Sequence, residues 1–163
     1  MPSPYALPEL IGARLEAQSL GVPILYAADL DGVFESSQVA PAIHVLPYQL
    51  TVVDASDPSA IALKEVVVVA VVVRFANQRS GQGVRQLASP LLARAALALT
   101  GWPPTTGYEK LQIETPPLPR LKNGHGSYPL QFSTRYQLSA PWPRSSIPPS
   151  NTRPVSRRTR LPR

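Results

Sequence analysis

The sequence predicts an α+β fold: a largely antiparallel four- or five-strand sheet with two helices packed on one face, plus an extended C-terminal tail. One observation behind this prediction is an unbroken apolar run at residues 66–73, in which seven of the eight residues are valine. The second is that segments with the 3.6-residue period of a helix occur along the chain with segments of the two-residue period of a strand. The third is a change of composition at residue 139, after which proline and arginine dominate.

The valine run is the expected centre of the sheet. Valine is stiff at χ1 and fits a pleated sheet better than a helix, and eight residues make a strand of about 26 Å. A membrane span needs about 20 apolar residues, whereas this run is bounded by Glu65 and Arg74. Because a sheet with one face in water alternates apolar and polar residues, the unbroken run predicts that both faces of this strand are covered.

The N-terminal residues predict a helix and an edge strand. Residues 4–20 place leucine and isoleucine on one face, and Ser3 is the expected cap, although Pro8 is an alternative start. Residues 22–28 are short and apolar with a proline near the beginning, which is typical of a strand at the edge of a sheet.

A second long strand is expected at residues 42–53. The turn-forming sequence at residues 54–59 should join it to the valine strand as an antiparallel hairpin. Pro47 cannot donate a ladder hydrogen bond, so we expect a bulge or a missing partner there. His44 is interpreted as a partly buried, hydrogen-bonded residue of this strand rather than as a catalytic one.

The second helix is expected at residues 82–100. Its predicted buried face contains the following residues: Val84, Leu87, Ala88, Leu91, Ala95, Ala98 and Leu99. Pro90 should kink this helix, or Ser89 should cap a new helix at that point. Gly101 is the expected stop.

Two further strands are expected near the end of the folded part. Residues 109–115 should place Leu111 and Ile113 on one face, and residues 127–138 alternate aromatic or aliphatic residues with polar ones. The link between them contains Asn123–Gly124, which predicts a turn.

The composition predicts two parts, a domain at residues 1–138 and a Pro/Arg-rich tail at residues 139–163. The first part holds ten basic and ten acidic residues, whereas the tail holds six arginines and no acid. Such a segment cannot bury a core of its own and is typical of disordered or polyproline-like structure. We expect the tail to bind a partner through its arginines, which are Arg144, Arg153, Arg157, Arg158, Arg160 and Arg163.

No catalytic pattern is visible in the sequence. The chain has no cysteine, two histidines in unrelated contexts, no nucleophile elbow and no glycine-rich phosphate loop. We therefore expect no enzymatic activity, no cofactor and no metal. The N-terminus lacks the basic and apolar regions of a secretory signal, so we expect a soluble product of the host cytoplasm that does not enter a membrane.

The order of the segments resembles the phage tail terminator family over residues 5–138. The resemblance is carried by the stretches ADLDGVFESS, APAIHVLPYQL, VRFANQ, LALTGWPP, GYEKLQIE and YPLQFSTRYQL. It implies a small structural virion protein that forms a hexameric ring at the tail neck, caps the tail tube and joins the tail to the head connector. The family includes members of contractile tails, for which the sheath protein is a further partner. DNA would pass through such a ring and touch it in passing.

Other hypotheses stay open from the residues alone. Two helices cover one face of a sheet, so the second apolar face of the valine strand needs the long loops or a neighbouring subunit, and a ring neighbour would supply that surface. One alternative is another head–tail joining protein or a tail tube protein. A second alternative is a nucleic-acid-binding protein that acts through the basic C-terminal tail.

Overall fold

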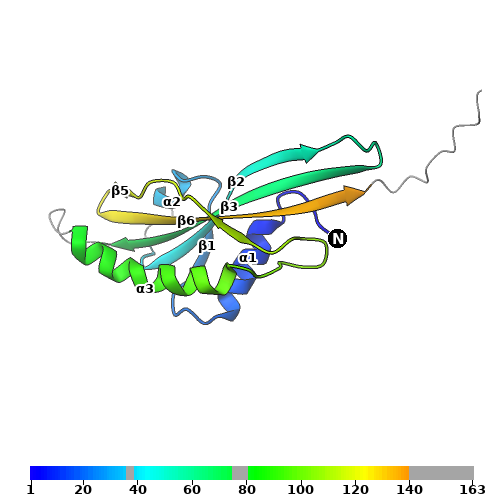
Figure 1. The fold of residues 1–163 in the computed structure, drawn as a ribbon. Helices are drawn as coiled ribbons and strands as arrows, with labels where there is room; N and C mark the ends of the chain where they lie inside the picture. The colour runs from blue at the N-terminus through cyan, green and yellow to red at the C-terminus, as the bar shows by residue number, and fades with distance from the viewer. Residues whose placement is uncertain (36–38, 75–80, 140–163) are drawn as a thin grey trace, which may run out of the picture.

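A computed structural model describes residues 1–35, 39–74 and 81–139 of the chain. In chain order the elements are α1 (Leu7–Ala17), β1 (Ile24–Tyr26), α2 (Gly32–Glu35), β2 (Ala42–Asp54), β3 (Ala60–Arg74), α3 (Gly81–Leu99), β4 (Gln112–Glu114), β5 (Arg120–Lys122) and β6 (His125–Ser139). They form one sheet in the order β1-β2-β3-β6-β4, with β5 also paired to β6. Figure 1 shows α1 and α3 on one side of the sheet and α2 on the other.

The α+β prediction is confirmed, but the sheet is mixed and has six strands. The strand β1 runs parallel to β2, with Ile24 opposite Ile43, and the other pairings are antiparallel. A tight hairpin cannot join two parallel neighbours, so the chain between β1 and β2 crosses over one face of the sheet. The sequence did not predict α2 and β5, which have only four and three residues.

The valine strand is the centre of the sheet, as predicted. Every residue from Val66 to Val73 is at most 4% exposed, because β3 lies between β2 and β6 and both of its faces are covered. Its alternate side chains enter two separate clusters. Val67, Val69 and Val71 pack with α1 and α3, whereas Val68, Ala70 and Val72 pack on the opposite face.

The opposite face is covered by the chain itself. Val33 of α2 packs there against the second cluster, with Ala27 and Leu30 beside it. Of the two coverings that the sequence left open, the long loops and a ring neighbour, the segment between β1 and β2 therefore supplies the first. The double burial of β3 needs no second subunit.

The helices differ from prediction mainly at their boundaries. Helix α1 begins at Leu7 with Ala6 as an N-cap that makes no side-chain bond, so Pro8 and not Ser3 marks its start. Helix α3 runs through Pro90 as a single element. On α3, Ala88, Ala95, Ala98 and Leu99 are buried as predicted, but Leu87 is 62% exposed.

The predicted strand pairings are confirmed, with local corrections. The β2–β3 register shifts between Pro47 and Gln49, where a bulge was expected. Asn123 and Gly124 both have positive φ and close the β5–β6 hairpin. Of the two residues expected on one face of the strand predicted at residues 109–115, Leu111 is buried and Ile113 is 48% exposed.

Candidate functional site

Three strands continue past the helices as an arm, which we define as residues 48–54 of β2, 60–65 of β3 and 134–139 of β6 (Figure 1). The pairing keeps the arm intact to its end, because Ala60 is opposite Ser139 and Ala62 is opposite both Asp54 and Gln137. The arm is long because β2 and β3 have 13 and 15 residues, well above the usual five or six.

One face of the arm is apolar. Leu63 and Tyr136 are opposite each other on this face and pack against Tyr108, whose ring centroid lies 4.8 Å from that of Tyr136. Further out, Val52 is 59% exposed and Ile61 is 44% exposed. The apolar face of the sheet therefore runs beyond the residues of this chain that cover it.

The base of this apolar face contains a buried carboxyl group. Glu65 is 1% exposed, and its Oε2 accepts a hydrogen bond of 3.0 Å from the Tyr136 hydroxyl. Burial raises the pKa of the Glu65 carboxyl, against smaller opposing effects of the Tyr136 hydroxyl and the Leu7 and Tyr5 amides. The group thus favours its neutral form more than an exposed glutamate does.

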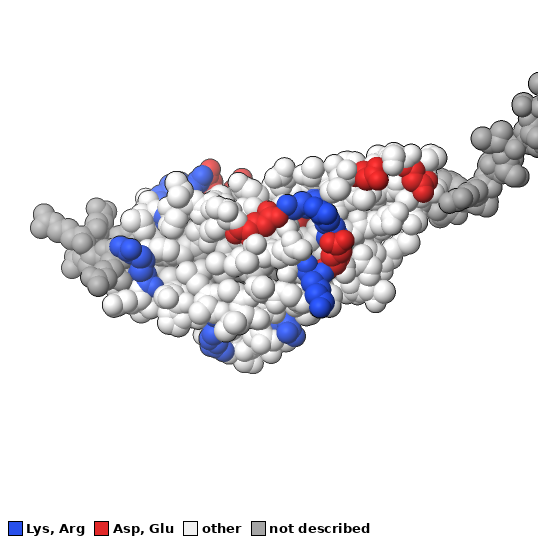
Figure 2. All heavy atoms as spheres, viewed as in Figure 1, with Lys and Arg blue, Asp and Glu red and all other residues white. Residues whose placement is uncertain are grey.

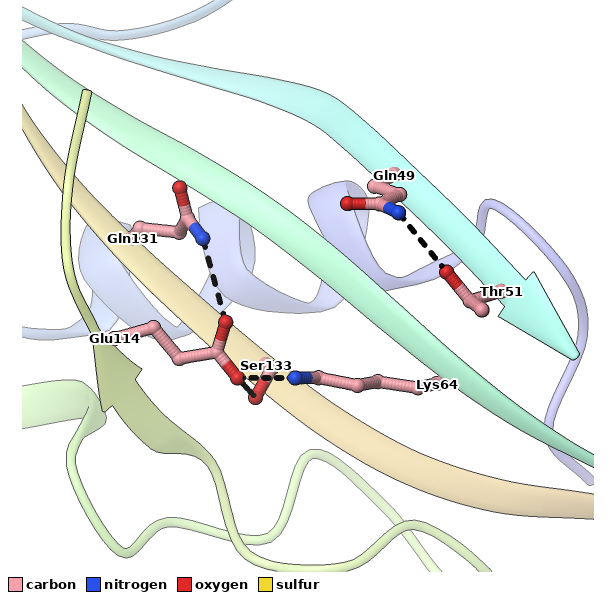
Figure 3. A network of polar contacts seen from close by, with 6 residues as sticks. All are labelled: Gln49, Thr51, Lys64, Glu114, Gln131 and Ser133. Atoms are coloured by element: carbon pink, nitrogen blue, oxygen red, sulfur yellow. Dashed lines mark hydrogen bonds and ion pairs between the residues drawn. The ribbon is translucent and has the colours of Figure 1, made fainter. Parts of the chain in front are cut away.

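The opposite face of the sheet is polar where the arm begins (Figure 3). Glu114 of β4 forms an ion pair with Lys64 and accepts hydrogen bonds of 2.6 Å from Ser133 and 3.3 Å from Gln131. Lys64 beside it lowers the pKa of the Glu114 carboxyl, with the Ser133 hydroxyl as the next cause. These contacts fix β4 onto β6 and β3.

The outer edge of β2 is open along the arm. The strand β1 pairs only with residues 43–45, and the last bond on this side joins the Ala27 amide to the Val45 carbonyl at 3.2 Å. Beyond Val45, no described strand pairs with this edge. Residues 46–53 carry no charge, and exposed Tyr48, Val52 and Val53 lie among them. Long, uncharged edges are uncommon in monomers because they pair with other chains.

The opposite edge of the sheet ends at β4. Just before it, the Leu111 backbone bonds to Gly101 and Trp102, at 2.8 Å and 2.9 Å. Within the described residues, no strand pairs with the outer side of β4 itself. Beside Ile113, which is 48% exposed, lies a shallow hollow of about 690 Å³ lined by Ile113, Glu114, Thr115 and Gln131.

The two histidines are not brought together. His44 is fully buried on the face covered by α2, and neither ring nitrogen has a partner among the described residues, so the expected hydrogen bonds are not seen there. Burial lowers the pKa of His44. His125 lies at the β5–β6 turn, where its Nδ1 is 2.9 Å from the Asn123 carbonyl.

Charges on the described surface are interspersed. Figure 2 shows lysine, arginine, aspartate and glutamate mixed over a mainly uncharged face, without a single-sign patch. The six arginines proposed as a partner site, Arg144, Arg153, Arg157, Arg158, Arg160 and Arg163, lie outside the described residues. The arm and its open edge were missed in the sequence, although the uncharged residues LPYQLTVV were a usable signal.

Comparison with known proteins gives a family and a fold. A family model described as phage tail terminator protein matches residues 1–143. No curated protein matches the chain. A solved chain described as "Virion of native gene transfer agent (GTA) particle" is 20% identical with a TM-score of 0.51, and the match covers 82% of this chain and 99% of that one. Another solved chain, at 14% identity and a TM-score of 0.42, covers 82% of this chain and 92% of its own length. None of the described helices is long and apolar enough to cross a membrane.

Proposed function

Because the chain belongs to the phage tail terminator family, we propose that it is a structural virion subunit that assembles into a ring at the tail neck. In this role the ring caps the tail tube and joins the tail to the head connector. We propose six subunits, as the family resemblance implies. The match covers residues 1–143, which include all the described elements.

The observation that carries this proposal is the arm with its open, uncharged edge. Both faces of the valine run in β3 are covered by the chain, since α1 and α3 pack on one face and α2 on the other. The arm instead leaves apolar side chains of Val52, Val53 and Ile61 at least 44% exposed. A subunit that works in an assembly has a use for such a surface, whereas a monomer has to keep it from aggregating.

The described residues also favour a structural role over catalysis. The polar cluster around Glu114 is an ion pair with hydrogen bonds between neighbouring strands, which stabilises the sheet without presenting a nucleophile and a base. We propose that the protein acts by binding other virion proteins. Partners in this proposal are the tail tube protein, the head connector protein and, in a contractile tail, the sheath protein.

Growth of the tail tube tests the proposed function. Purified tail tube protein would be polymerised with and without this protein, and tube lengths measured by negative-stain electron microscopy. We expect shorter tubes with extra density at one end, because the cap stops addition of subunits. Unchanged lengths with bare ends would contradict the proposal. Long tubes formed by this protein alone would instead identify it as a tube subunit.

The second candidate function, nucleic-acid binding through the tail, makes a different prediction. DNA binding by the full chain would fall with salt and disappear when residues 140–163 are removed, because arginine–phosphate contacts release counterions. We favour a protein partner, since a strong grip on DNA would hinder passage through a ring.

A further inference from the structure

The sheet ends in two different open edges, and a ring needs two different surfaces on each subunit. A ring contact is heterologous, which means that one patch of a subunit meets another patch of the next. On one side of the sheet lies the edge of β2 beyond Val45, and on the other side lies the edge of β4. These edges are candidates for the two halves of one contact.

The two edges lie at the same position along the strand direction, which we call their height. Gln112 of β4 is opposite Ser133, which is opposite Val66, which is opposite Gln49 of β2. By the same route, Glu114 is level with Leu46. The open edge of β2 therefore begins at the level of β4.

The two edges also run in opposite directions. From β2 to β3, from β3 to β6 and from β6 to β4 the pairing is antiparallel each time, so β4 runs opposite to β2. Rotation about an axis along the strands changes neither height nor direction. It would bring the β4 edge of one subunit beside the β2 edge of the next, in antiparallel orientation, which is the stronger strand pairing.

The exposed side chains match in position and kind. Ile113 is opposite Phe132, which is level with Val67 and Pro47, so Ile113 and Tyr48 have nearly the same height on the two edges. They are 48% and 49% exposed. Joining the edges would bury both apolar side chains and pair backbone groups that are otherwise left to water, with Pro47 contributing only its carbonyl because it has no N–H.

From this geometry we propose that the occupant of the open β2 edge is a second copy of this chain, which adds its β4 edge, residues 112–115, to residues 46–49. Within one chain, Tyr108 is opposite Tyr136 and therefore has the same height as Leu63 and Val52. In the joined sheet, Val52 and Val53 of one copy would therefore pack on the residues around Tyr108 of the next. This proposal rests on the ring proposed above and identifies the two surfaces of each subunit that form the contacts in it. The sheet would continue from one subunit to the next.

The test uses one variant for each edge in the full chain. Tyr48→Lys/Val52→Lys places two charges on the β2 edge, and Ile113→Lys places one on the β4 edge. All three side chains are exposed, so each variant should fold, as checked by circular dichroism and thermal melting. We expect each to raise the concentration needed for half-assembly by about tenfold or more, because the charge must be buried in the joined edge. Leu87→Lys/Leu97→Lys on α3, at 62% and 83% exposed, is the matched control and should assemble normally.

Mixing the two edge variants distinguishes a heterologous contact from a symmetric one. The first variant keeps an intact β4 edge and the second keeps an intact β2 edge, so together they can make one good contact. We expect a heterodimer that grows no further, seen by native mass spectrometry. Rings formed by both edge variants at wild-type concentration would overturn the edge assignment and leave the proposed function standing. Assembly lost only in the β2 variant would indicate a symmetric β2–β2 contact and also overturn it. Wild-type protein that stays monomeric, with no effect on tube growth, would overturn both.

Discussion

Val69→Asp should abolish folding. Val69 is fully buried in the cluster beneath α1 and α3, and an unpaired carboxylate there costs several kcal/mol against a total stability of about 5–15 kcal/mol. Circular dichroism and solubility of the expressed protein check this outcome. Leu97→Asp, at a position 83% exposed, is the control and should fold. A soluble, folded Val69→Asp protein would show that β3 is not central.

Glu65→Gln should flatten the dependence of stability on pH. Burial raises the folded-state pKa of Glu65 above its unfolded value, so its contribution is fully present below the unfolded pKa of about 4.3 and is lost as pH rises through the folded pKa. Glutamine keeps an acceptor for the Tyr136 hydroxyl and does not ionise. Urea unfolding between pH 4 and pH 8 measures the difference.

We expect the wild type to lose stability relative to Glu65→Gln as pH rises across that range. The exposed Glu109→Gln substitution serves as the control and should follow the wild type. Parallel curves for wild type and Glu65→Gln would show that Glu65 has the same proton affinity in both states.

At the scale of elements, the turn of the β5–β6 hairpin is set by the backbone preferences of its two central residues. Asn123 and Gly124 have φ of 51° and 74°, which matches the Asn-Gly preference of two-residue hairpins. The sequence predicted this turn, because its signal lies in two adjacent residues. It did not predict the three-residue β5, which exists only through its pairing with residues 125–127.

Gly124→Ala should destabilise the protein by about 1–2 kcal/mol, since an L side chain is strained at this positive φ. Thermal melting and urea unfolding measure the loss. Gly32→Ala is the matched control, because the added methyl group would meet the Asp29 carboxylate at an ordinary 3.4 Å and φ is not positive there. Equal stability of the two variants would mean that the turn tolerates another conformation.

The open edge of the arm is a feature of the fold that the sequence did not predict. The extent of β2 and the bulge at Pro47 were predicted from the sequence and are confirmed, whereas β3 is longer than the eight-residue valine run that predicted it. Whether the edge of β2 is open depends instead on how short β1 is, and β1 covers only residues 43–45. The uncharged run at residues 46–53 was a signal of an edge strand, but the sequence does not show that β1 ends before this run and leaves the edge open.

For the whole molecule, the division between folded domain and tail leads to a prediction about virion assembly. Ser139 still pairs with Ala60 at the end of β6, so truncation after Ser139 leaves the described sheet complete. We expect this truncation to keep folding and ring formation and to weaken attachment to the neighbouring virion component, because six arginines are lost.

Tail joining in a complementation assay measures the effect of this truncation. A full-length variant with the six arginines changed to glutamine separates the loss of charge from the loss of chain. Normal joining and infectivity of the truncated protein would show that the tail has no role in attachment. Loss of the ring itself would place the tail in the contact between subunits.

The mass of the assembled particle tests the ring most directly. Native mass spectrometry of the purified full-length protein, over a range of concentrations, gives the number of 17.6 kDa subunits per particle. We expect one closed species, with six subunits, that gives way only to smaller species on dilution. A monomer at every concentration, or open chains that lengthen without limit, would contradict it.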